Sequence, residues 1–152
     1  MGFKKTSDTI AISFGLSELA ANTFIQQEIQ LQLDVLNNEI FVVVAADLDL
    51  TPPDATAATD TATVSSICAT SQTGVTNLSN SNCIATARDS IMARGFTDGG
   101  VSFSRAAESA YPGEVDYIAL ISTNNFFVQL AGLANTDPKS VTGRVWGYRA
   151  RS

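Results

Sequence analysis

The side chains that could carry chemistry in this chain of 152 residues are carboxylates, arginines and two thiols, because the sequence contains no histidine. Histidine is the commonest general base near neutral pH and a frequent zinc ligand, so its absence removes Ser-His-Asp and Cys-His mechanisms and most zinc sites. The sequence also lacks a G-x-S-x-G elbow, a P-loop and a dinucleotide-binding fingerprint. We therefore expect no enzymatic activity, no cofactor and no tightly bound metal.

Two groups of carboxylates are close enough in sequence to act together. Asp47 and Asp49 share one face of a predicted strand, and together with Asp54 they could hold a Ca²⁺ ion. Glu114 and Asp116 are also two residues apart, and carboxylate pairs perform acid–base chemistry in glycosidases. The simpler interpretation is favoured for both groups: Asp47 and Asp49 form an acidic strand face that needs no ion, and Glu114 and Asp116 are solvated acids at the turn into a strand.

The two cysteines, Cys68 and Cys83, are too few for a disulfide framework or for a metal site of their own. Their separation fits facing positions on two strands joined by the loop SQTGVTNLSNSN. A disulfide between them is one hypothesis. The other is a pair of buried thiols, since free cysteine packs as a small apolar residue.

Basic residues are concentrated at the end of the chain. Arg144, Arg149 and Arg151 lie in the last nine residues, whereas no Lys or Arg occurs between Thr6 and Ala87, where acids are numerous. Guanidinium and carboxylate groups form paired hydrogen bonds of defined geometry. We expect these three arginines to contact acidic surface of a neighbouring copy; the alternative is a solvated strand end beside a solvated acidic surface.

The same C-terminal segment holds two aromatic residues at alternate positions. Trp146 and Tyr148 share one strand face with Arg144, and Gly143 and Gly147 flank the other face. Glycine in a strand marks close approach of neighbouring backbone. We expect the aromatic side chains to pack in the core. An exposed aromatic platform, as in a lectin, is the alternative.

Composition indicates one globular domain over residues 1–152. The chain is 45% hydrophobic and only 16% charged, with a net charge of −6, which argues against nucleic-acid binding. No apolar stretch is long enough to span a membrane. The N-terminal segment lacks the features of a secretory signal, so we expect synthesis in the cytoplasm.

Hydrophobic periodicity is close to two along most of the chain, which predicts strands. The alternation is clearest in EIQLQLD, residues 28–34, and in the second half of IFVVVAADLDL, residues 40–50. Other predicted strands lie near 9–16, 62–70, 83–93, 101–106, 116–122, 126–132 and 141–150. About eight antiparallel strands at this spacing predict an all-β sandwich or jelly-roll, with at most one or two short helices. Residues 17–27 and 85–96 are the alternative helical segments.

The last part of the chain, DYIALISTNNFFVQLAGLANTDPKSVTGRVWGYRARS at residues 116–152, resembles single β-barrel capsid proteins of the sphaerolipovirus type. The features that match are the Asp-Tyr-Ile strand, Thr-Asn-Asn-Phe-Phe, and the Gly-Arg-Val-Trp-Gly-Tyr-Arg-Ala ending. The resemblance implies a jelly-roll and self-assembly into an icosahedral particle. It also implies location in the virion, with other copies and other virion proteins as partners.

Two functions are therefore expected from the sequence. The first is a virion structural protein, either a capsid or a decoration subunit. The second is a carbohydrate-binding or adhesin-type β-sandwich that recognises a host-surface glycan.

Overall fold

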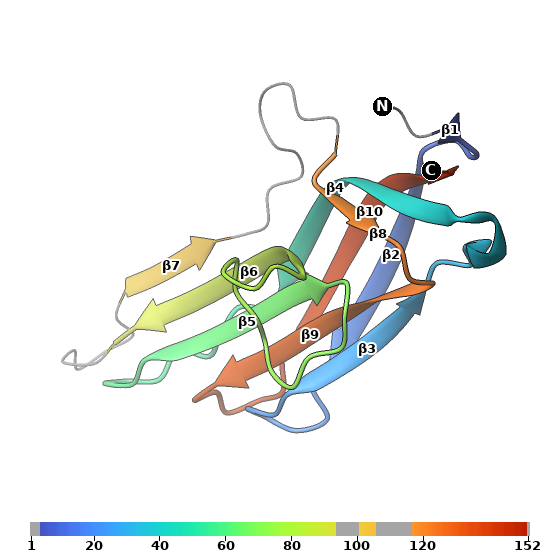
Figure 1. Ribbon diagram of the computed structural model, residues 1–152. Helices are drawn as coiled ribbons and strands as arrows, with labels where there is room; N and C mark the ends of the chain where they lie inside the picture. The colour runs from blue at the N-terminus through green and yellow to red at the C-terminus, as the bar shows by residue number, and fades with distance from the viewer. Residues whose placement is uncertain (1–3, 94–100, 106–116, 152) are drawn as a thin grey trace.

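The computed structural model describes residues 4–93, 101–105 and 117–151, and this part of the chain is almost entirely β-strand (Figure 1). The only described helix is a short 3₁₀ turn, Val35–Asn37. In the residues described, no helix is long and apolar enough to cross a membrane. The ten described strands are β1 Lys4–Lys5, β2 Ile10–Ser17, β3 Ile25–Gln30, β4 Glu39–Leu50, β5 Thr61–Cys68, β6 Cys83–Met92, β7 Val101–Arg105, β8 Ala119–Ile121, β9 Asn125–Leu133 and β10 Ser140–Arg151.

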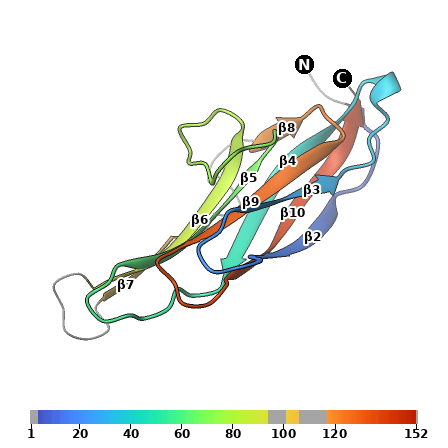
Figure 2. The same ribbon diagram turned by 90° about the horizontal axis from the view of Figure 1, so that it is seen from below.

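The strands form two antiparallel sheets that face each other (Figure 2). The first sheet has the order β2-β10-β4-β8, and β1 continues the β2 edge along β10. The second sheet has the order β3-β9-β5-β6-β7. Leaving out β1 and β7, the eight remaining strands form two four-stranded sheets, with β2 beside β10 in one and β3 beside β9 in the other. This is the strand order of a jelly-roll, so the predicted all-β fold is confirmed.

Strand β4 shows how a bulge reconciles its two sequence patterns. Its pairing with β10 shifts between Trp146 and Gly147, leaving Val44 as the extra residue on β4. Before the bulge Phe41 and Val43 are in the core, and after it the core positions are Ala46, Leu48 and Leu50. One inserted residue reverses which alternate positions face inward, so an apolar run is followed by regular alternation.

The alternating segment at residues 28–34 is a strand only in part. Strand β3 begins earlier, at Ile25, and ends at Gln30. Leu31 and Leu33 are buried as expected, but Gln32 has a φ of 55°, which lies in the left-handed region and ends regular pairing. The alternation therefore predicted burial correctly and the end of the strand incorrectly.

Both alternative helical segments are wrong for the residues described. Residues 85–92 belong to strand β6, where Ala85 and Ala87 face the core and pair with β5, so sheet packing outweighs the helix propensity of alanine. Residues 94–96 of that segment lie outside the described residues. In the segment 17–27, β2 ends at Ser17 and β3 begins at Ile25. The buried Glu18 carboxylate accepts hydrogen bonds from the backbone N–H groups of Thr23, Gly132 and Lys139, which holds this turn in a non-helical form.

The core lies between the two sheets. Phe14 of β2 and Phe126 of β9 contact edge to face, with ring centroids 6.2 Å apart, and so join the sheets directly. Phe41 of β4 is completely buried. The aliphatic core residues around these rings are Leu31, Leu33, Val43, Leu48, Leu50, Ile67, Ile121, Val128, Leu130, Val141 and Val145.

Strand β10 turns its glycines, not its aromatic residues, toward the core. A Cβ atom built on Gly143 would lie 2.5 Å from Cζ of Phe14, and one built on Gly147 would lie 2.6 Å from Cε2 of Phe41. Close backbone approach on the glycine side is therefore confirmed. The expectation that Trp146 and Tyr148 pack in the core is wrong, because phenylalanine rings occupy the space inside β10. Both aromatic residues lie half-buried on the outer face.

A polar cluster joins two loops at the end of the sandwich where β10 begins. Lys139 is buried, and its Nζ lies 2.6 Å from Oδ1 of Asp54. The other carboxylate oxygen of Asp54 accepts the backbone N–H groups of Thr136 and Asp137. The hydrogen bond from Lys139 is the main reason why the pKa of Asp54 falls to about 2. Asn135 adds hydrogen bonds to Ala62 and Asp54, so the loops before β5 and before β10 are fixed together.

Replacing Gly147 with alanine tests the contact between β10 and the core. The new methyl group would lie 2.3 Å from the Val42 carbonyl oxygen as well as against Phe41, so we expect a loss of about 3 kcal/mol in the free energy of unfolding. The matched control is Gly15→Ala on the neighbouring strand, where the nearest atom is 3.8 Å away; its stability should stay within about 1 kcal/mol of the parent. Urea unfolding of the three proteins measures both values. Equal stability of the two variants would contradict this packing.

Candidate interaction surface on the outer face of β4 and β10

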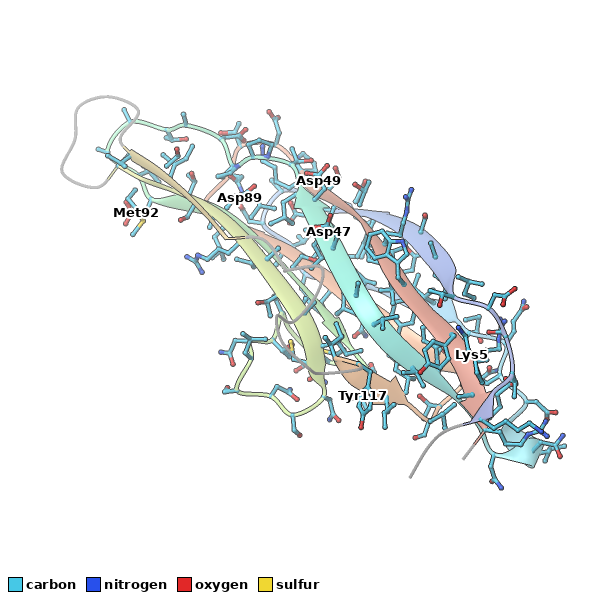
Figure 3. All side chains as sticks on the ribbon, turned by 90° about the horizontal axis from the view of Figure 1, so that it is seen from above. Lys5, Asp47, Asp49, Asp89, Met92 and Tyr117 are labelled. Carbon is cyan, nitrogen blue, oxygen red and sulfur yellow. The ribbon has the colours of Figure 1, made fainter. Side chains whose placement is uncertain are left out.

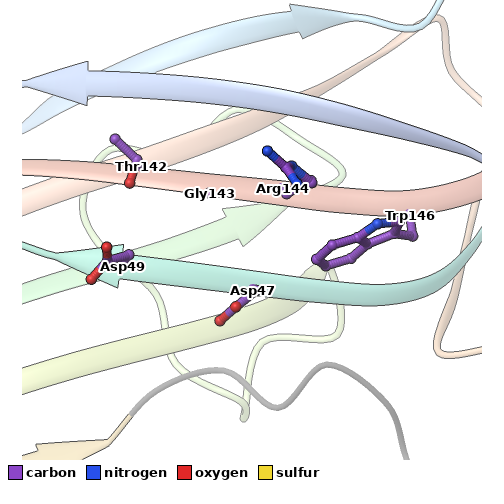
Figure 4. A pocket seen from close by; sticks show the side chains of 6 residues that line it. All are labelled: Asp47, Asp49, Thr142, Gly143, Arg144 and Trp146. Atoms are coloured by element: carbon purple, nitrogen blue, oxygen red, sulfur yellow. The ribbon is translucent and has the colours of Figure 1, made fainter.

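A shallow hollow of about 200 Å³ lies on the outer face of the first sheet (Figure 4). Its walls come from two adjacent strands, because Thr142 and Arg144 of β10 stand opposite Asp49 and Asp47 of β4. Trp146 lies at one end of the hollow. The six residues that line it are Asp47, Asp49, Thr142, Gly143, Arg144 and Trp146.

The charged groups in this hollow do not neutralise one another. Arg144 points toward β2, where its Nε donates a 3.0 Å hydrogen bond to Oγ of Ser13 (Figure 4). Although Asp47 is its direct cross-strand partner, no ion pair joins the two within the described residues. Asp47 and Asp49 are both exposed. Their carboxylates therefore face solvent, beside a partly exposed indole ring.

Three other basic residues of the first sheet lie at its opposite end, where Figure 3 labels Lys5. Lys4 pairs with Arg151 and Lys5 with Ala150, and Lys4, Lys5 and Arg151 are all exposed. The Lys5 Nζ lies over the Tyr148 ring, 4.8 Å from its centroid. We call Lys4, Lys5 and Arg151 the basic end, and Asp47 and Asp49 the acidic end. At about 3.3 Å per residue, the two ends are about 20 to 30 Å apart along β10.

One acid lies within the basic end and is already held by its own chain. Glu39 stands opposite Arg151, and its carboxylate accepts hydrogen bonds from the Asp34 backbone N–H and from the Thr6 hydroxyl. These bonds, in that order, lower the pKa of Glu39, with a smaller contribution from Arg149. Glu39 therefore stays ionised and orders the turn before β4.

The three C-terminal arginines have different surroundings. Arg144 and Arg151 are exposed. Arg149 stands opposite the core residue Phe41, and its Nη2 donates a 3.1 Å hydrogen bond to the Leu31 carbonyl. Its Nε is buried without a hydrogen-bond partner among the described residues. Arg149 thus links β10 to the segment that follows β3 in its own chain, while the contact of all three arginines with a neighbouring copy stays a prediction.

The two cysteines stand directly opposite each other on β5 and β6. Both are free thiols, with Cys68 buried and Cys83 half-buried. The facing positions expected from the sequence are therefore present, and the disulfide itself stays a prediction.

The carboxylates considered for Ca²⁺ are not brought together. Asp54 is bound to Lys139 and to backbone N–H groups, whereas Asp47 and Asp49 lie on the sheet face. In the described ranges, no three His, Cys, Asp or Glu side chains form a group suited to a metal ion. Glu114 and Asp116 lie outside the described residues.

Sequence reasoning missed the residues that complete this surface. Lys4 and Lys5 become part of it only because β1 pairs with the far end of β10. The buried pair of Lys139 and Asp54 was missed as well, since neither residue lies in a periodic segment. For Trp146, the glycines on either side were a usable signal: they marked the inward face of β10 and so placed the indole outside.

Comparison with models of protein families found no match to this chain, and comparison with curated proteins found none either. Among solved structures, a chain described as Desmodium yellow mottle tymovirus is similar over 95% of this chain and 89% of its own, with 10% sequence identity and a TM-score of 0.31. A likeness this distant carries no inference about function. The sphaerolipovirus-like character of residues 116–152 stays a prediction.

Substitution of single arginines separates the internal role from a surface role. We expect Arg149→Ala to lower the free energy of unfolding by about 1 to 2 kcal/mol, because it removes a charged hydrogen bond and the packing of a long side chain. Arg144→Ala should cost less than about 0.5 kcal/mol, since the side chain is exposed. Thermal and urea unfolding of the monomer measure the difference. Equal losses for the two variants would contradict the inward placement of Arg149.

Proposed function

We propose that this protein is a virion structural protein, a capsid or decoration subunit that assembles with copies of itself into an icosahedral particle. The observation that carries this proposal is the jelly-roll strand order, which is common among viral capsid domains and also occurs in lectins and cupins. The resemblance of residues 116–152 to sphaerolipovirus-type capsid proteins favours the capsid class. In this proposal the protein is made in the host cytoplasm and resides in the virion.

The charge distribution on the first sheet supports contact between copies. The basic end and the acidic end occupy opposite ends of one sheet, so the basic end of one copy is complementary to the acidic end of the next. Such a head-to-tail contact uses two different patches. It forms a closed ring when the rotations from each copy to the next add up to a full turn. Complementary charge also fixes the register of a contact and disfavours wrong partners. Arg151 belongs to the basic end. Arg144 lies beside the acidic end, which the basic end of the neighbouring copy would contact.

Charge reversal at each end tests this contact. We expect Lys4→Glu/Arg151→Glu and Asp47→Lys/Asp49→Lys each to weaken assembly, because like charges then face each other. Combining all four substitutions should restore assembly, since the two ends are again opposite in charge. The measurement is the sedimentation profile of purified protein over a range of salt concentrations, with electron microscopy of the particles.

The matched control is Asp137→Lys, which changes an exposed acid outside both ends and should leave assembly unchanged. Circular dichroism confirms that each variant is folded. Failure of the fourfold variant to recover, with each pair of substitutions still folded, would contradict the head-to-tail contact. A protein that stays monomeric at high concentration and is absent from purified virions would contradict the structural role itself.

Glycan binding is a second candidate function, favoured by one observation. Trp146 is partly exposed beside Asp47, Asp49 and Thr142, and sugar-binding sites commonly combine an aromatic surface with hydrogen-bonding polar groups.

If this function is correct, a glycan array should give a signal that Trp146→Ala lowers at least about tenfold, which corresponds to about 1.4 kcal/mol. Phe24→Ala, at an exposed aromatic residue away from the hollow, is the matched control and should retain the signal. Absence of any glycan signal from the parent protein would contradict this second function.

A further inference from the structure

A bulge in strand β6 places the two cysteines opposite each other. Ile67 pairs with Ala85, and the next pair is Cys68 with Cys83, so Ile84 is the extra residue. In a regular ladder without the bulge, Cys68 would stand opposite Ile84, and Cys83 would point to the other side of the sheet. Bulges commonly redirect a side chain in this way. The irregularity therefore creates a cross-strand pair of thiols at the base of the 69–82 loop.

The cross-strand pairing of these cysteines suits a covalent bond between them. Directly opposed residues of an antiparallel pair have Cα atoms about 4.5 to 5.5 Å apart. Disulfides span Cα separations of about 4.4 to 6.8 Å. Both side chains lie on the outer side of the second sheet, because Sγ of Cys68 is 2.9 Å from Oγ1 of Thr76 in the loop that covers this side.

The two thiols differ in exposure and in acidity. Cys68 has no exposed surface, whereas Cys83 is half-buried. Interaction with the Cys68 thiol lowers the pKa of Cys83 below its ordinary value, and the same interaction, together with burial, raises the pKa of Cys68. Cys83 is therefore the more exposed of the two cysteines. It is also the one more readily present as a thiolate, which is the nucleophilic form.

We propose that Cys68 and Cys83 are a redox pair in which Cys83 attacks a small-molecule disulfide and Cys68 then closes a cross-strand disulfide. In the first step the Cys83 thiolate bonds to one sulfur of the small disulfide and expels the other as a thiolate. In the second step Cys68 loses its proton to that thiolate or to water, and its sulfur displaces the remaining small thiol from Cys83. The protein loses two electrons and two protons, and the small disulfide becomes two thiols.

The bond would fix a loop that already covers part of the second sheet (Figure 1). Cys68 and Cys83 directly flank residues 69–82. Inside the loop, the Gln72 backbone N–H donates to Oε1 of Gln26, and the Thr76 backbone N–H donates to Oγ of Ser66. The cross-link joins both ends of the loop and restricts the unfolded chain. Because thiols stay reduced inside cells and oxidise outside them, the loop would be locked only after the protein leaves a reducing compartment.

This inference concerns a thiol pair on the second sheet and does not depend on the proposed virion role. The experiment treats the reduced full-length protein with glutathione disulfide and follows the intact mass. We expect the parent protein to lose the mass of two hydrogen atoms and to resist subsequent alkylation. Its melting temperature should rise by about 5 to 10 °C, as estimated for a loop of this length in a domain of this size.

Two serine variants separate the steps. Cys68→Ser should stop at one glutathionyl group on Cys83, because no second thiol can displace it. Cys83→Ser should remain unmodified under native conditions, because Cys68 is buried. Cys68→Ala should also slow the glutathionylation of Cys83 relative to Cys68→Ser, since alanine cannot donate a hydrogen bond to the thiolate.

Three results would overturn the proposal. The first is a parent protein that keeps both thiols open to alkylation after treatment. The second is a disulfide only between two chains, seen as a dimer on a non-reducing gel. The third is faster glutathionylation of Cys68 in the Cys83→Ser variant than of Cys83 in the Cys68→Ser variant.

Discussion

The close approach of strand β10 to the core is the constraint on which the rest of the structure depends. β10 pairs with β2 and β1 along one edge and with β4 along the other, so it is central to the first sheet. Gly143 and Gly147 leave room for the rings of Phe14 and Phe41, and Phe14 in turn contacts Phe126 of the opposite sheet. Any side chain at these glycines would separate the sheet from its own core.

The same constraint produces the outer surface. Because phenylalanine rings from neighbouring strands fill the space inside β10, the aromatic side chains of β10 itself are placed outside. Trp146 and Arg144 then lie beside the carboxylates of β4, and Tyr148 lies under Lys5. An interior packing requirement thus sets the arrangement of the aromatic and charged groups that a partner would meet.

Bulges and buried polar contacts determine which strand positions face inward and how the loops are arranged. The extra residue Val44 lets β4 change which alternate positions face inward, and the extra residue Ile84 brings the two thiols together. At the end where β10 begins, Glu18 and Asp54 satisfy backbone N–H groups of two loops and of strand β9. A buried polar group is costly unless it is hydrogen-bonded, so these contacts restrict the loops to one arrangement.

The sequence by itself determined the all-β class, most strands and the exposed positions of Asp47 and Asp49, because a period of two is a local property of any half-buried strand. It also indicated that the glycine side of β10 is packed closely. Only the tertiary structure decided that the rings of Phe14 and Phe41 fill the space inside β10, that Arg149 reaches the carbonyl of Leu31, and that Lys139 is buried against Asp54. Each of these outcomes depends on residues far away in the chain that compete for the same space or the same hydrogen bond, and local periodicity contains no information about them.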